Sequence, residues 1–150
     1  MVYQWNKALV IALVADLIAQ FVKPIFYYMK TKQWDFGLVV SNGGFPSSHA
    51  ATVTALTTRI GFQEGIQSTF FAISFIFSLI VLFDAAGVRQ EVGKHSKTLN
   101  DLIGLLKMKE KVKFDELEEW IGHNTVEVFG GVLLGGIIGW SLGLLPALSL

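Results

Sequence analysis

Nineteen consecutive residues without a charge, GIQSTFFAISFIFSLIVLF, occupy positions 65–83. A second uncharged stretch, of 23 residues, runs from Val128 to Leu150. A helix of about 20 apolar residues crosses the roughly 30 Å of hydrocarbon in a bilayer, because each residue adds about 1.5 Å. Both stretches are long enough to span a membrane, and the sequence therefore predicts an integral membrane protein.

Two other apolar stretches are less typical of membrane spans. Ala8–Val22 lies between lysines and is interrupted by Asp16 and Gln20. It is short enough for a signal peptide, but no small-x-small cleavage site clearly follows it, so we expect a retained helix. Pro46–Phe62 is rich in Ala, Thr and Val, which suits a helix packed closely among other helices. The sequence predicts an all-α membrane bundle with about four apolar helices, in a single domain over residues 1–150.

The polar part of the chain and the overall composition exclude several classes of function. Residues 87–122 form a mixed-charge connection whose periodic apolar residues predict an amphipathic helix. Twelve basic and twelve acidic residues cancel, so the chain lacks the cationic excess typical of nucleic-acid binding. The chain has no cysteine, which excludes disulfides, thiol nucleophiles and thiolate metal sites. We expect neither a metal ion nor another cofactor, because only one short metal-ligand spacing, His-x3-Glu, occurs.

A stripe of glycines follows one face of the last apolar stretch, at Gly131, Gly135, Gly139 and Gly143. Small residues at this spacing let a second helix approach closely. The second helix can belong to the same chain or to another copy, in which case the stripe would support a homo-oligomer.

Four alternating spans would bring sequence-distant polar groups to one face of the membrane. The end of the first segment, the start of the second, the end of the third and the start of the fourth would share that face. Ionisable groups beside membrane spans are costly, so their convergence indicates a functional site. The groups concerned are Lys23, Ser47, Ser48, His49, Asp84, Arg89, His123 and Glu127.

Most of the cations fall on the same face. The positive-inside rule then places this face in the cytoplasm, and we expect the membrane to be that of a bacterial cell. The ten cations are Lys23, Lys30, Lys32, Arg89, Lys94, Lys97, Lys107, Lys109, Lys111 and Lys113.

A glycine turn, Gly43–His49, leads into the second apolar segment. Backbone N–H groups in such a turn, together with the positive end of the following helix, form an anion site, and Ser47 and Ser48 add hydroxyl donors. The same residues also fit a plain turn followed by a capped helix. His49 favours the anion site, because its imidazole can donate or accept a proton there.

A histidine and a carboxylate, His123 and Glu127, are four residues apart and share one helical face. The carboxylate can hold one ring nitrogen protonated and leave the other as a nucleophile. The alternative is an ordinary ion pair within a helix, which has the same spacing and no catalytic role. The two residues stand at the start of a charge-free span, where ionisable groups are energetically costly and usually functional. We therefore expect a catalytic pair.

These segments resemble the divergent type-2 phosphatidic acid phosphatases, which are related to acid phosphatases and vanadium-dependent haloperoxidases. The resemblance covers nearly the whole chain. It rests on Gly43–His49, on Asp84–Arg89 with Gly93 and Asn100 after it, and on Gly122-His123 followed by Glu127-Val128.

The wider superfamily surrounds the phosphoryl group with three elements, of which the first two are Lys-x6-Arg-Pro and Pro-Ser-Gly-His. Lys23 and Lys30 are similar to the first, although Lys30 stands in place of the arginine. Pro46, Ser47 and His49 fit the second element, with a serine in place of its glycine.

The third element of the superfamily is Arg-x5-His-x3-Asp. His123 fits its nucleophile, and Glu127 replaces its aspartate. The arginine is missing, since Leu117 stands there, and we expect Arg89 to supply that cation from another helix.

The resemblance implies hydrolysis of a lipid-linked phosphate or diphosphate through a phosphohistidine, without a metal. His123 would attack phosphorus, Glu127 would orient it, and His49 would protonate the leaving oxygen. Loss of one preorganised donor commonly costs about 3 kcal/mol of transition-state stabilisation. The alternative is therefore a non-catalytic membrane protein that binds an anionic lipid head group or phosphate, or that scaffolds partners. The residues expected to bind phosphate are Lys23, Lys30, Gly43, Gly44, Ser47, Ser48 and Arg89.

Overall fold

The computed structural model describes residues 6–41, 43–107, 117 and 122–142, and each of its described elements is helical. The prediction of an all-α fold is confirmed. The elements are α1 (Lys7–Thr31), the 3₁₀ helix η1 (Phe36–Val40), α2 (Ser48–Glu64), α3 (Thr69–Phe83), the π-helical segment η2 (Asp84–Val88), α4 (Arg89–Lys107) and α5 (Thr125–Ser141). The expectations that concern Lys109, Lys111, Lys113 and Gly143 lie outside the described residues.

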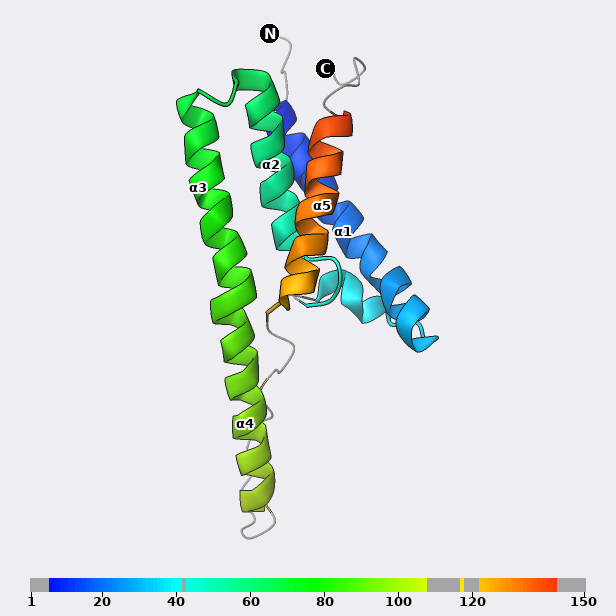
Figure 1. Cartoon of the computed structure of the whole chain (residues 1–150). Coiled ribbons are helices and arrows are strands. Elements are labelled where there is room, and N and C mark those ends of the chain that lie inside the picture. The colour runs from blue at the N-terminus through cyan, green and yellow to red at the C-terminus, as the bar shows by residue number, and fades with distance from the viewer. Residues whose placement is uncertain (1–5, 42, 108–116, 118–121, 143–150) are drawn as a thin grey trace.

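The central helix of the bundle is α2, which contacts α1, α3 and α5 (Figure 1). It begins at the end of the bundle where α1 and α3 finish and where α5 starts. These four helix ends therefore lie together at one end of the bundle, as predicted. Beyond this end, α4 continues away from the bundle as an extension of α3.

Helix α1 is longer than the apolar stretch that predicted it. Its apolar part ends at Val22, but the helix continues through Lys23 and Pro24 to Thr31 and closes on Lys32 in the left-handed conformation. Pro24 lies inside α1 and is buried, although a proline at such a position removes one backbone hydrogen bond. Lys23 thus lies within the helix, and the expectation that it closes the first segment is wrong.

The uncharged run of the third apolar segment stops before Asp84, but the helix does not end there. Helix α3 passes directly into η2 and α4, where the N–H of Arg89 donates to the carbonyl of Asp84. The segment from Asp84 to Arg89 contains no proline, and one wide π turn accommodates the extra residue. The amphipathic helix predicted within residues 87–122 is confirmed as α4.

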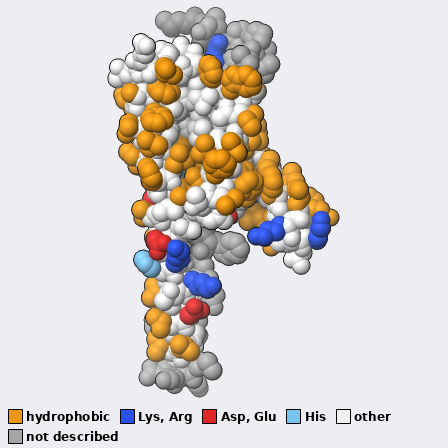
Figure 2. All heavy atoms as spheres, in the orientation of Figure 1, with side chains coloured by type: hydrophobic (Ala, Val, Ile, Leu, Met, Phe, Trp, Pro, Cys, Tyr) orange, Lys and Arg blue, Asp and Glu red, His pale blue; other side chains and the backbone are white. Residues whose placement is uncertain are grey.

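Two helices are long and apolar enough to cross a membrane by length and composition. They are α1 and the continuous helix Thr69–Leu106, while α5 is a shorter apolar helix among the described residues. The threonines and Arg59 of α2 make it less apolar than these. Of the roughly four apolar spans that the sequence predicts, two are thus supported by length and composition. Figure 2 shows hydrophobic side chains over the sides of the bundle and charged ones gathered at the end from which α4 projects.

The glycine stripe of α5 packs against α2 of the same chain. A methyl group added at Gly131 would meet the backbone of Ser47, and one added at Gly135 would meet the backbone of Ala51. Gly139 approaches Ala55 in the same way, with 2.9 Å from the position of its Cβ to the Ala55 carbonyl. The three glycines are therefore occupied by contacts within one chain and do not form a free surface for a second copy.

Candidate active site

The start of α5 holds a histidine and a carboxylate in contact. Asn124 caps the helix by accepting from the N–H of Glu127 at 2.9 Å, and Glu127 accepts in return from the N–H of Asn124 at 3.2 Å. The same Glu127 oxygen, Oε2, lies 3.1 Å from Nδ1 of His123. The capping box therefore fixes the carboxylate in the position from which it can orient the imidazole.

His123 is almost fully enclosed, with 1% of its surface exposed. Its backbone N–H donates to the carbonyl of Ala85 at 3.2 Å, which ties it to η2. Its Nε2 is buried and has no hydrogen-bond partner among the described residues. If Nδ1 carries the proton that faces Glu127, Nε2 holds the free lone pair. The ring is thus arranged as an oriented imidazole with one nitrogen available for a ligand or substrate.

The second imidazole, that of His49, comes from the first turn of α2 and faces the first. The two ring centroids are 5.9 Å apart, and the ring planes are inclined at 63°. Nδ1 of His49 is also buried without a hydrogen-bond partner in the described part of the chain. The N–H of Ser47 donates to the carbonyl of Glu127 at 2.9 Å and so joins the starts of α2 and α5. The sequence-distant histidines meet as predicted. Across the described ranges, no three His, Asp or Glu side chains form a group that could hold a metal ion.

The glycine turn lies beside the histidines, but its serine hydroxyls have structural partners. Ser47 is the N-cap of α2 and accepts from the N–H of Ala50 at 3.3 Å. Ser48 accepts from the side-chain amide of Gln20 at 3.2 Å. Each hydroxyl keeps one proton to donate. Gly44 has a φ of 91°, a conformation that side chains other than glycine rarely adopt.

Lys23 is the most deeply placed cation of this region, with 1% of its surface exposed. Its ammonium donates to the carbonyl of Ser41 at 2.9 Å, and its charge interacts with those of Asp16 and Glu127. An ammonium has three protons, so Lys23 can still donate to a bound anion. Burial of such a charge is costly unless it is compensated, and the two carboxylates provide that compensation.

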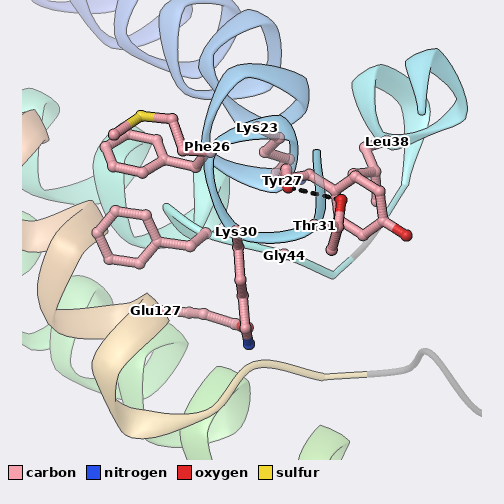
Figure 3. Close-up of a pocket in the computed structure, with 10 residues that line it drawn as sticks. Lys23, Phe26, Tyr27, Lys30, Thr31, Leu38, Gly44 and Glu127 are labelled. Carbon is pink, nitrogen blue, oxygen red and sulfur yellow. Dashed lines mark hydrogen bonds between the residues drawn. The ribbon is translucent and has the colours of Figure 1, made fainter. Parts of the chain in front are cut away.

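A cavity of about 670 Å³ opens next to Glu127 (Figure 3). Lys30 is exposed at the end of α1 and lines this cavity together with Lys23 and Gly44. The predicted first element, Lys23 and Lys30, is thus brought to the same cavity as Glu127. The other lining residues are Phe26, Tyr27, Met29, Thr31, Leu38 and Phe45.

Arg89 lies behind the loop that precedes His123. A methyl group at Gly122 would meet the backbone of Arg89 and Gln90, so the residue before His123 packs directly on the start of α4. Nε of Arg89 donates to Oδ2 of Asp84 at 2.6 Å, and the positive charge of Arg89 acts on His49. The remaining N–H groups of the guanidinium can point to a phosphate.

Leu117, where the superfamily has its arginine, is held away from the site by α4. Its N–H donates to the side chain of Asn100 at 2.9 Å, and its carbonyl accepts from the same side chain at 2.8 Å. Arg89 is therefore the arginine among the described residues that lies beside His123.

Three polar residues that the sequence did not assign to the site lie along the interface of α1 and α2. The hydroxyl of Thr52 is 3.2 Å from Oδ1 of Asp16, and Gln20 donates to Ser48. Oε1 of Gln20 is buried without a partner in the described chain. The available signal was the spacing of Asp16, Gln20 and Lys23, which puts all three on one face of an otherwise apolar helix.

The comparisons with known proteins agree with this arrangement of motifs. The sequence profile of the Divergent PAP2 family matches residues 4–138. A protein of Bacillus subtilis (strain 168), whose name is "Uncharacterized membrane protein YuiD", is 38% identical over 141 residues, covering 87% of this chain and 89% of that protein. No solved structure matches the chain. The chain therefore belongs to the divergent PAP2 family.

Proposed function

We propose that this protein is an integral membrane hydrolase that cleaves a lipid-linked phosphate or diphosphate through a phosphohistidine, without a metal. The observation that carries the proposal is the meeting of His49 and His123, whose ring centroids are 5.9 Å apart. Each ring has one buried nitrogen without a hydrogen-bond partner in the described chain, and Glu127 orients one of the rings. Buried polar atoms without partners are rare in native structures and here suggest a place for a substrate.

In this mechanism Nε2 of His123 attacks phosphorus in line with the leaving oxygen. Glu127 keeps Nδ1 protonated and stabilises the positive charge that develops on the ring. His49 gives its proton to the leaving oxygen and then takes a proton from the water that hydrolyses the phosphohistidine.

Negative charge on the phosphoryl oxygens would be stabilised from two sides. Lys23 and Lys30 approach from α1, while Arg89 approaches from the start of α4. Backbone N–H groups of Gly43 and Gly44, and the hydroxyls of Ser47 and Ser48, add donors from the turn before α2. Fixed donors in a water-poor site contribute strongly to such transition states.

The test is phosphate release by the purified protein from several lipid phosphates in detergent micelles. His123→Ala and His49→Ala are expected to abolish it. Turnover by His123→Ala at the rate of the parent protein would refute the phosphohistidine mechanism.

A second candidate is a non-catalytic protein that binds phosphate or an anionic lipid head group. It is favoured by one observation: Leu117 replaces the superfamily arginine, and Arg89 is already paired with Asp84. Binding of vanadate or phosphate without turnover of any lipid phosphate would support this candidate over the enzyme.

We also propose that the site faces the cytoplasm of a bacterial cell. The support is the gathering of cations at the end of the bundle from which α4 projects, as expected from the positive-inside rule. The chain contains no cysteine, so single-cysteine variants report orientation directly. Gln67→Cys, between α2 and α3 at the other end, is expected to react with an impermeant reagent in intact cells. Lys97→Cys, on α4, is expected to react only after lysis, and the reverse result would refute this orientation.

A further inference from the structure

Helix α3 lies at the edge of the bundle and packs within the chain along one side. Among the described helices of the bundle it packs mainly on α2, where Ser74 and Ser78 are buried and the Ser78 hydroxyl donates to the carbonyl of Val53 at 3.0 Å. Residues two positions after these serines lie about 200° around the helix and therefore point away from α2. That outer side carries four large apolar residues, spaced alternately by three and four and between 55% and 75% exposed: Ile73, Ile76, Ile80 and Phe83.

The same spacing continues along α4, beyond the bundle. His95 takes the one position of the pattern that is not apolar. A different face of α4 is used within the chain, since Gly93 and Ser96 are buried there and the Asn100 side chain bonds to Leu117. The apolar residues of the pattern are between 43% and 64% exposed: Val88, Val92, Leu99, Leu102 and Leu106.

The wide turn of η2 keeps the two halves of this pattern in line. The N–H of Arg89 donates to the carbonyl of Asp84, five residues back instead of four. A turn of this kind holds one extra residue, so each residue stacks on the one five positions before it. Phe83 and Val88 are five residues apart, and a regular α-helix would place Val88 about 100° further around. The exposed apolar residues of α3 and α4 therefore form one continuous line, which we call the α3–α4 stripe.

The spacing and the size of the α3–α4 stripe are those of a helix–helix interface. Apolar residues that alternate at intervals of three and four have an average period of 3.5, which is typical of a coiled coil. Together the nine apolar side chains expose on the order of 1,000 Å², comparable to the roughly 800 Å² that one partner contributes to a stable interface. The stripe is therefore large enough to hold a second helix along its whole length.

Lipid can cover only half of the α3–α4 stripe. The continuous helix Thr69–Leu106 has 38 residues and is about 57 Å long, whereas the hydrocarbon of a bilayer is about 30 Å thick. Its α4 half extends away from the bundle (Figure 1) and carries charges from Arg89 to Asp101, so it lies outside the hydrocarbon. An apolar stripe of this size in water marks a protein interface.

We propose that this protein is a homodimer in which the α3–α4 helices of two copies pair in parallel along the α3–α4 stripe. Two copies of one chain insert in the same orientation, because the same distribution of cations directs both. Their α3–α4 helices therefore run parallel, and each stripe residue meets its own counterpart across a two-fold axis. A single polar residue within such a stripe fixes the register of a pair, and His95 has that position.

Disulfide cross-linking tests the pairing directly, because the chain contains no cysteine. A disulfide forms only where two Cα atoms approach within about 7 Å, as counterparts on a parallel stripe do. Ile80→Cys and Leu99→Cys are expected to give a product of twice the chain's mass when membranes are treated with a mild oxidant. The matched controls are Phe75→Cys, which is 46% exposed on α3 outside the stripe, and Lys97→Cys, on the opposite side of α4. Neither control is expected to form this product.

A charge in the stripe tests the energetics. Leu102 is 51% exposed in the single chain, so Leu102→Lys is expected to leave the helical content measured by circular dichroism unchanged. Each copy loses a leucine that the pairing would bury, and the dissociation constant of the dimer in detergent micelles is expected to rise by about tenfold or more. Lys97→Glu changes the charge on the opposite side of α4 and should leave the dissociation constant as it is. Sedimentation equilibrium is the measurement.

Several results would overturn the homodimer. One is the absence of the product in Ile80→Cys and Leu99→Cys, and another is an equal yield in the two controls. A cross-linked product of any other mass would mean that a different protein covers the stripe. Protection of Leu99→Cys from a maleimide in a monomeric protein would mean that the chain covers the stripe itself. Phosphate release that depends on His123 is a separate measurement, so this proposal and the proposed function can fail independently.

Discussion

Oε2 of Glu127 lies 3.1 Å from Nδ1 of His123, and the same oxygen caps the first turn of α5. One carboxylate thus contacts both the start of the helix and the imidazole of His123. Glutamine also supports a capping box, so Glu127→Gln is expected to fold normally. It loses the negative charge that orients and stabilises the imidazole, and kcat is expected to fall by about 100-fold or more.

Phosphate release and thermal unfolding in detergent micelles check this prediction together. Glu91→Gln, which removes an exposed carboxylate on α4, is the control and should retain full activity. Full turnover by Glu127→Gln would mean that its carboxylate does not position His123.

Arg89 is expected to replace the arginine that is missing at Leu117. Arg89→Ala removes a donor aimed at the developing negative charge, so kcat is expected to fall by about 100-fold or more. The pair of Arg89 with Asp84 is partly exposed and contributes less than about 1 kcal/mol to the free energy of unfolding. Stability should therefore hardly change.

Lys94→Ala, which removes another exposed cation of α4, is the control for Arg89. Steady-state kinetics with vanadate inhibition is the measurement. If Arg89→Ala and Lys94→Ala behave alike, Arg89 has no part in phosphate recognition.

Gly122 is expected to be intolerant of a side chain for two independent reasons. Its φ is 98°, and a methyl group there would meet the backbone of Arg89 and Gln90. Gly122→Ala should separate the loop before His123 from α4 and cost about 1–3 kcal/mol, with loss of phosphate release.

The matched variant for Gly122 is Gly87→Ala, because nothing lies within 4 Å of the added methyl group in η2. Circular dichroism melts of both variants test the contact. Equal melting temperatures for the two would contradict the described packing of the loop.

Two adjacent glycines of α5 should respond in opposite ways. Gly135→Ala places a methyl group against the backbone of Ala51 and is expected to destabilise the bundle by about 1–3 kcal/mol, because neither helix backbone can yield easily. Gly136→Ala meets open space and should be neutral or stabilising by up to about 1 kcal/mol, since alanine favours helix. Thermal unfolding in micelles compares them. A larger loss in Gly136→Ala would show that the stripe does not pack on α2.

Local patterns in the sequence predicted much of the helical structure, because helix formation depends on neighbouring residues. The uncharged stretch at 65–83 predicted α3. The two serines before the second apolar segment, Ser47 and Ser48, predicted a cap for α2, and the cap is Ser47. The four-residue spacing of His123 and Glu127 predicted their contact, since one helical turn brings such side chains together. In each case the interacting groups are close in the chain.

The ends of helices were predicted less well. Charge patterns indicated that two apolar segments end at Lys23 and Asp84. Helix α1 nevertheless continues past Lys23, and α3 passes through η2 into α4 without a break. Neither a lysine nor an aspartate breaks a helix by itself, and each has a partner here: Lys23 donates to the Ser41 carbonyl and Asp84 pairs with Arg89.

By itself, the sequence determined that the chain forms apolar helices, that a glycine turn precedes one histidine, and that a carboxylate follows the other by one turn. Alternating spans placed the two imidazoles at one end of the bundle, but only the tertiary structure decided how closely they approach, that Arg89 packs behind His123, and that the stripe of glycines is used within the chain. These relationships depend on how closely α2 and α5 approach and on the wide turn that joins α3 to α4. Such contacts join residues that are distant in sequence, and no local periodicity specifies them.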